Sequence, residues 1–190
     1  MKPLLIATHN ADKLREFEKL LAPKFSCRKP DGAWPVPEEI GKTYRENAEM
    51  KARSLYRFAK TPCLSDDSGL EIDALDGAPG VHSADFGGEG ISWQERWNYT
   101  YAKLLASKQT NWSARFRCVL CYFDGKTAQF FEGTTEGEIA AVPKGTHGFG
   151  YDPIFYSRVL RCTLGEASDE QKASVSHRAR AAQAFLSFQK

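Results

Sequence analysis

No stretch of this 190-residue sequence approaches the roughly 20 consecutive apolar residues that a membrane-spanning helix needs. The apolar run near the N-terminus, residues 3–7, is also too short for the apolar region of a secretory signal peptide. We therefore expect a soluble, cytoplasmic protein that does not bind membranes.

An excess of charge of either sign is also missing. The 26 lysine and arginine residues nearly balance the 24 aspartate and glutamate residues, which leaves a net charge of +2. Without a basic stripe or a known recognition motif, the sequence argues against a nucleic-acid-binding protein. A hydrophobic content of 42% is typical of a folded globular chain, and the length suits one domain over residues 1–190.

Cysteines are few and show no disulfide framework. Their number, five, is odd, which favours free thiols in a reducing compartment. Cys118 and Cys121 form a CxxC pair of the kind found in redox and metal sites. However, the surrounding residues 115–123 read as a strand, on which positions three apart face opposite sides. We therefore interpret both thiols as buried and structural.

Apolar periodicity predicts helices that alternate with strands early in the chain and a hairpin in the middle. Strands are expected over residues 3–7, 25–28, 63–65, 70–75, 115–123, 127–131, 136–142 and 154–156. Helices are expected over residues 12–21, from Thr43 to a stop at Pro62, over residues 92–107, and from the capping box at Ser168 onward. The predicted class is α/β with a mixed sheet, in one continuous unit.

The turn from the first strand to the first helix holds a candidate anion site. Backbone N–H groups at a helix N-terminus attract phosphate, and Lys13 adds a positive charge there. Taken alone, Asn10 or Asp12 could equally serve only to cap the helix.

The acidic cluster Asp66-Asp67-Ser68-Gly69 follows a short apolar stretch. Adjacent carboxylates at such a place are costly unless a cation offsets their loss of hydration, and Mg²⁺ typically uses one or two carboxylates together with phosphate oxygens. A carboxylate could also take a proton from an attacking water. The alternative is an exposed turn rich in aspartate, serine and glycine.

Two glutamates are candidates for a second acidic group. Glu46 occupies the third position of a Thr-x-x-Glu capping box, which already explains its presence. Glu38 lies in a proline-rich loop without a helical duty, and we favour it as the partner of Asp67.

Two further segments could bind a nucleotide. Phe149, exposed between glycines, could stack on a base, and Asp152 could accept a base N–H; a packed turn is the alternative. In the last helix, Lys172, His177 and Arg178 lie beside the apolar stripe. On their own they would suggest a solvated helix face.

Together these segments resemble the inosine/xanthosine triphosphate pyrophosphatase family, also called Ham1-like. The matching motifs occur in order along almost the whole chain. They are Thr8-x-Asn10-x-x-Lys13, Glu46-Asn47-Ala48-x-x-Lys51-Ala52, Ser65-Asp66-Asp67-Ser68-Gly69-Leu70, Gly77-Ala78-Pro79-Gly80, Ala114-Arg115-Phe116, Gly148-Phe149-Gly150-Tyr151-Asp152-Pro153, and Lys172 with Ser176-His177-Arg178. One departure is Asp85, where the family often has arginine.

The resemblance implies a long mixed sheet with helices on its faces, two lobes around a central cleft, and a homodimer. It implies hydrolysis of ITP, dITP and XTP to the monophosphate and pyrophosphate, with Mg²⁺ as cofactor. Asp67 would be the proton acceptor and a metal ligand, and Glu38 the other ligand. The implied substrate contacts are Thr8, His9, Asn10, Ala11, Asp12, Lys13, Lys51, Ser68, Phe149, Gly150, Tyr151, Asp152, Lys172, His177 and Arg178. In this set His177 and Arg178 would read the 6-oxo group of the base, because an arginine donor favours an oxygen over an amine.

Overall fold

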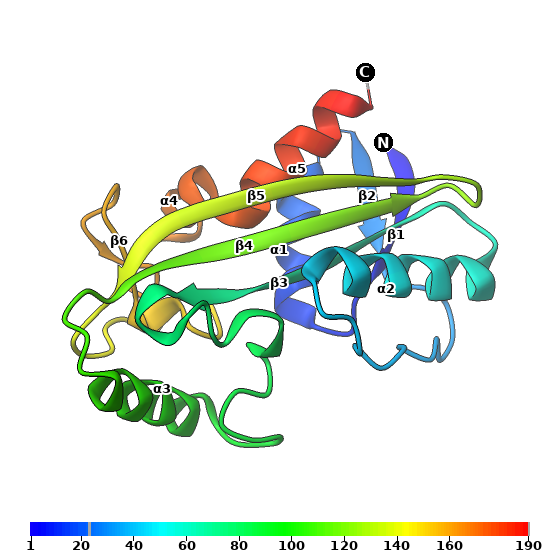
Figure 1. Cartoon of the computed structure of the whole chain (residues 1–190). Coiled ribbons are helices and arrows are strands. Elements are labelled where there is room, and N and C mark those ends of the chain that lie inside the picture. The colour runs from blue at the N-terminus through cyan, green and yellow to red at the C-terminus, as the bar shows by residue number, and fades with distance from the viewer. Residues whose placement is uncertain (23, 190) are drawn as a thin grey trace. The chain divides into compact units, whose positions relative to one another are not determined.

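The structure, a computed structural model, describes residues 1–22 and 24–189 and has the predicted α/β class (Figure 1). Its described strands form one seven-stranded sheet in the order β2-β1-β3-β4-β5-β6-β7. The strands are β1 Lys2–Ala7, β2 Phe25–Arg28, β3 Cys63–Ile72, β4 Ser113–Phe123, β5 Ala128–Ile139, β6 Phe155–Ser157 and β7 Cys162–Thr163. The α-helices are α1 Ala11–Leu21, α2 Tyr44–Ala59, α3 Trp93–Ser107, α4 Asp169–Val175 and α5 His177–Phe188.

The sheet is mixed, as predicted. β1 pairs in parallel with β2 and with β3, whereas β5 pairs antiparallel with β6, and β6 with β7. Short 3-10 turns follow β3 and precede β6; these are η1 Asp73–Leu75, η2 Gly80–His82 and η3 Asp152–Ile154. No helix in the described ranges is long and apolar enough to cross a membrane.

The chain divides into two compact units. The first consists of Met1–Asp67, Cys118–Gly133 and His177–Lys190, and the second of Ser68–Arg117 and Thr134–Ser176. The interpretation as a single domain stays a prediction. Each unit has its own apolar core. In the first unit Phe17, Leu64 and Phe185 are fully buried, and in the second Leu70, Leu104 and Phe155 are.

The cysteine interpretation is confirmed for the CxxC pair. Cys118 and Cys121 are fully buried on β4, and both are free thiols. Burial raises the pKa of the Cys121 thiol to about 12 and raises that of Cys118 further. Thiols that hold their protons so firmly are poor nucleophiles, so the pair belongs to the core.

Three boundary predictions were wrong. The two strands expected over residues 63–65 and 70–75 are joined in one strand, β3, which runs straight through the acidic cluster and ends at Ile72; residues 73–75 form the 3-10 turn η1. The segments expected over residues 127–131 and 136–142 are likewise joined in one strand, β5, which spans only Ala128–Ile139.

The last helix is two helices, because Ser176 leaves the helical conformation at φ −70° and ψ 150°. Ser176 still closes α4, since its backbone N–H donates to the carbonyl of Lys172 at 2.9 Å. α5 then begins at His177.

Candidate active site

The acidic doublet Asp66-Asp67 lies inside β3, so its two side chains point to opposite faces of the sheet. Asp66 is 1% exposed and Asp67 is 4% exposed. Figure 1 shows α2 on one side of β3 and α1 and α5 on the other. The two neighbouring carboxylates therefore meet different partners, and they are best treated as two separate groups.

Asp67 is held by two residues of α2. Its Oδ1 lies 3.4 Å from Nζ of Lys51, and its Oδ2 accepts a hydrogen bond of 3.1 Å from Nδ2 of Asn47. Asn47 and Lys51 are one helical turn apart and belong to the buried face of α2. Burial raises the pKa of Asp67 to about 6 and the negative charge of Glu39 adds to this, although Lys51 opposes the shift. A carboxyl group tuned in this way can exchange a proton near neutral pH.

The second carboxylate beside Asp67 belongs to Glu39. Its Oε1 lies 3.1 Å from Nζ of Lys51, so that one ammonium group contacts both acidic side chains. Glu38, the metal ligand that we predicted, is an exposed neighbour in the same loop. Glu46 caps α2, because its Oε2 accepts from the backbone N–H groups of Lys42 and Thr43 at 2.7 and 3.1 Å. The structural interpretation of Glu46 is thus confirmed.

Lys51 remains charged between these acids. Burial disfavours the ammonium form, but Asp67, Asp66 and Glu39 outweigh this cost and raise the pKa of Lys51 above its usual value. The site therefore holds a fixed positive charge beside a carboxylate that can take a proton.

Asp66, on the other face of β3, meets two cations. Its Oδ2 lies 2.8 Å from Nζ of Lys13 and 3.8 Å from Nε of Arg178, and Nη1 of Arg178 also contacts Oε2 of Glu16 at 3.2 Å. Burial alone would raise the pKa of Asp66, but Lys13, Arg178 and Lys51 together lower it far below its usual range. Asp66 is thus a permanent anion that joins the N-terminus of α1 to the N-terminus of α5.

The predicted phosphate turn is ordered by its own side chains. Asn10 caps α1, since its Oδ1 accepts from the backbone N–H groups of Asp12 and Lys13 at 2.9 and 3.1 Å. Thr8 Oγ1 accepts from the N–H of Asn10 at 3.1 Å. His9 lies edge-on to the buried ring of Trp34, 5.5 Å between centroids. The capping role of Asn10 is confirmed. Because the cap already takes two N–H groups of the helix N-terminus and Lys13 is paired with Asp66, the phosphate role of this turn stays a prediction.

A second group of predicted residues lies in the second unit. Oδ2 of Asp152 accepts from the backbone N–H of Phe149 at 2.7 Å and from Nζ of Lys172 at 2.6 Å. The Lys172 ammonium also sits 4.7 Å from the centroid of the half-buried Phe149 ring, a cation–π contact. Asp152 and Lys172 together therefore hold the Phe149 loop in a defined conformation.

Other residues of this group are anchored differently. Tyr151 is buried and its hydroxyl donates to the carbonyl of Ser83 at 3.0 Å, while the carbonyl of Gly150 accepts from the indole of Trp97 at 3.0 Å. Ser68 is half-buried on β3, directly after Asp67 in the chain.

The solvated helix face expected from Lys172, His177 and Arg178 alone is not what the structure shows. All three side chains are buried. Lys172 is paired with Asp152, and Arg178 with Glu16 and Asp66, which is how buried cations are usually accommodated.

Sequence reasoning assigned no role to Asn47, although it lies in one of the matching motifs, and none to Glu39. Asn47 could have been found, because it lies four residues before Lys51 on the same helix face. Glu39 had no local signal that distinguished it from Glu38.

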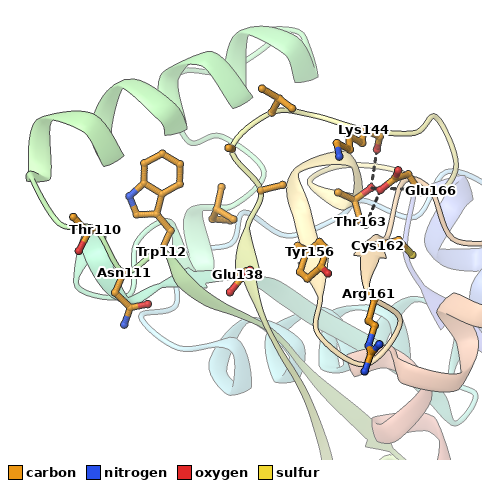
Figure 2. Close-up of a pocket in the computed structure, with 14 residues that line it drawn as sticks. Thr110, Asn111, Trp112, Glu138, Lys144, Tyr156, Arg161, Cys162, Thr163 and Glu166 are labelled. Carbon is orange, nitrogen blue, oxygen red and sulfur yellow. Dashed lines mark hydrogen bonds between the residues drawn. The ribbon is translucent and has the colours of Figure 1, made fainter.

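The second unit also contains a cavity of about 560 Å³ (Figure 2). Residues around it include Asn111, Trp112, Tyr156, Arg161 and Glu166. None of the predicted site residues lines this cavity, so it does not coincide with the candidate active site.

Comparison with known proteins decides the family. The model of the Ham1 family matches residues 4–188. The chain belongs to the Ham1 family.

Relatives and a solved structure agree with this Ham1 assignment. The chain is 42% identical to a dITP/XTP pyrophosphatase of Treponema denticola over 94% of this chain and 93% of the relative. It is 39% identical to a dITP/XTP pyrophosphatase of Bacillus subtilis over 94% and 92% of the two chains. The solved structure of a HAM1 protein from Coxiella burnetii superposes with a TM-score of 0.91 at 34% identity, with all of both chains covered. The resemblance noted in the sequence is therefore confirmed.

Replacement of Asp66 by asparagine should destabilise the fold strongly. Lys13 and Arg178 would then lose a buried anion, and the loss of one partner of such a group costs about 3–5 kcal/mol. We expect this loss in the free energy of unfolding from denaturant titration. Asp31→Asn, which breaks an exposed pair with Arg28, is the control and should cost no more than about 1 kcal/mol.

The pH dependence of this difference follows from the lowered pKa of Asp66. Its stabilisation is complete above the unfolded-state pKa of about 3.9 and is lost as the pH falls through the lower folded-state pKa. The gap between wild type and Asp66→Asn should therefore persist from pH 7 to about 5 and shrink only in stronger acid. A gap that closed on going to alkaline pH instead would contradict this assignment.

Proposed function

We propose that this chain hydrolyses purine nucleoside triphosphates with a 6-oxo, deaminated base, namely dITP, ITP and XTP, to the monophosphate and pyrophosphate. The relatives named dITP/XTP pyrophosphatase support the substrate class. The observation that carries the chemistry is Asp67, a buried carboxylate with a pKa of about 6 that Asn47 and Lys51 hold in place.

In the proposed reaction Asp67 takes a proton from a water molecule, and the water oxygen attacks the α-phosphorus. The bond from the α-phosphorus to the oxygen that bridges it to the β-phosphorus breaks, and its electron pair leaves with pyrophosphate. Lys51 and Lys13 offset the negative charge that develops on the phosphates, a stabilisation by charges already in place. Thr8, His9, Asn10, Ala11 and Asp12, with Lys13, form the turn that holds the phosphates.

Mg²⁺ fits the oxygen ligands present. Asp67 and Glu39 bring two carboxylates to one ammonium group, whereas no group of three or more His, Cys, Asp or Glu side chains suited to a metal occurs within residues 1–22 and 24–189. Mg²⁺ is commonly held by one or two carboxylates plus substrate phosphates. When bound, it would neutralise phosphate oxygens and polarise the α-phosphorus. We propose Asp67 and Glu39 as ligands, in place of the predicted Glu38.

For the base, we propose that Phe149 provides a stacking surface, with the Gly150 to Asp152 segment and Lys172 around it and with Ser68 as a further substrate contact. His177 and Arg178 would donate to the 6-oxo group. Adenine has an amine at this position, which would leave such donors without an acceptor and so disfavour ATP.

The remaining expectations are also proposals. We propose a homodimer in the cytoplasm, with no nucleic-acid partner. A protein that binds nucleotides without turnover is the alternative class; the raised pKa of Asp67 favours catalysis.

Product analysis tests the reaction. We expect pyrophosphate and monophosphate from dITP, ITP and XTP in the presence of Mg²⁺, with slower release from GTP and ATP and little release in EDTA. Formation of orthophosphate and a nucleoside diphosphate would overturn the proposed cleavage site, and tight binding without products would support a protein that binds nucleotides without turnover.

Asp67→Asn should lower kcat by about 10²–10⁴-fold, the range for the loss of a general base. In the wild type, kcat/KM should rise with pH through about 6 as Asp67 loses its proton. The residual activity of the variant should lack this acidic limb. Asp76→Asn is a suitable control, because Asp76 is exposed and its left-handed backbone conformation tolerates asparagine.

Glu39→Gln and Glu38→Gln form a matched pair. We expect Glu39→Gln to raise the Mg²⁺ concentration for half-maximal activity by about tenfold or more. It should also move the acidic limb to lower pH, since the charge of Glu39 raises the pKa of Asp67. Glu38→Gln should behave as wild type. If Glu38→Gln raised the Mg²⁺ requirement and Glu39→Gln behaved as wild type, Glu38 and not Glu39 would be the metal ligand.

A further inference from the structure

Asn47 is a buried polar residue that takes part in no step of the proposed reaction. Asn47 is only 1% exposed to solvent and lies near the N-terminus of α2. It makes two hydrogen bonds: Oδ1 accepts from the backbone N–H of Gly41 at 2.8 Å, and Nδ2 donates to Oδ2 of Asp67 at 3.1 Å. One partner, Asp67, is itself a proposed metal ligand, and the other, Gly41, lies two residues from Glu39.

The orientation of this amide is chemically determined. A backbone N–H can only donate, so the amide oxygen has to face Gly41 and the amide nitrogen has to face Asp67. Asp67 consequently has one carboxylate oxygen held by Asn47 and the other beside Lys51. Two donors at the two oxygens fix the rotation of the carboxylate about its own axis.

The other end of Asn47 fixes the proline-rich loop. A Cβ atom at Gly41 would collide with Oδ1 of Asn47 and would come within 2.8 Å of Cβ of Glu46, so the loop backbone approaches α2 closely here. Glu39 is two residues away in the same loop and contacts Lys51. One side chain thus connects the loop of Glu39 to Asp67.

We propose that Asn47 is the positioning residue of this site, which orients Asp67 directly and places Glu39 through Gly41. The inference rests on the proposed function, because it assigns Asn47 a part in that reaction. A purely structural role would need only the bond to Gly41, whereas a positioning role needs the bond to Asp67 as well.

Two substitutions separate these roles. Asn47→Asp keeps an acceptor for Gly41 but, when ionised, replaces the donor to Asp67 with a second negative charge. Asn47→Ala removes both hydrogen bonds without adding a charge. Asn98→Asp and Asn98→Ala, on the exposed side of α3, make the same chemical changes away from the site. For each protein we would measure kcat and KM for dITP with Mg²⁺, folding by circular dichroism, and hydrogen exchange at the Gly41 amide.

We expect kcat to fall by about 10²-fold in both Asn47 variants, the scale of a misplaced catalytic group, while KM changes by less than about threefold. The Gly41 amide should stay protected in Asn47→Asp and lose protection in Asn47→Ala. Both Asn98 variants should match the wild type.

Two results would overturn the positioning role. Wild-type kcat in Asn47→Asp would leave Asn47 with loop anchoring alone. Wild-type kcat in Asn47→Ala would show that neither bond matters to turnover. A wild-type protein that releases no pyrophosphate from dITP would instead overturn the proposed function, and the inference with it, so the two failures are distinguishable in one assay.

Discussion

The structure depends on the burial of two adjacent carboxylates within one strand. Asp66 and Asp67 leave water almost completely, and each would be too costly to bury in its ionised form without a partner. Successive side chains of β3 point to opposite faces of the sheet, so each carboxylate has its own partners. Asp66 faces Lys13 and Arg178, and Asp67 faces Lys51 and Asn47. The helices beside β3 in the first unit therefore have to present cations at defined positions, which links their placement to the chemistry.

The two carboxylates end with opposite properties although they are neighbours in sequence. Asp66, with two strong cations against it, keeps a pKa far below the usual range, whereas burial takes the pKa of Asp67 to about 6. Because the two pKa values are shifted in opposite directions, one pair of aspartates provides both a permanent anion and a group that can accept a proton. The permanent anion pairs with Lys13 and Arg178, and Asp67 is left as the proton acceptor of the proposed reaction.

Much of the fold was predictable from local patterns, for identifiable reasons. The residues of β2 and the opening of α2 were predicted correctly because alternation and a capping box are local signals. The acidic cluster was misread as a break in the strand, because its compensating charges come from distant segments. The break between α4 and α5 at Ser176 was not predicted, because no proline or glycine marks it in the sequence. Among the proposed site residues, Asp67 was singled out from the acidic cluster and Lys51 only through the family resemblance, whereas our preference for Glu39 over Glu38 depends on how a loop turns.

The pairing of β1 with β3 also determines which face of the sheet each of the two carboxylates occupies. Leu5, Ile6 and Ala7 pair with Cys63, Leu64 and Ser65, the residues just before the doublet. A slip of one position in β3 would send every side chain to the opposite face. Asp67 would then lie on the face of Lys13 and Arg178, and Asp66 on the face covered by α2. Insertions or deletions in this strand are thus constrained twice, by packing and by the different charge partners of the two carboxylates, and the register itself is part of the proposed catalytic apparatus.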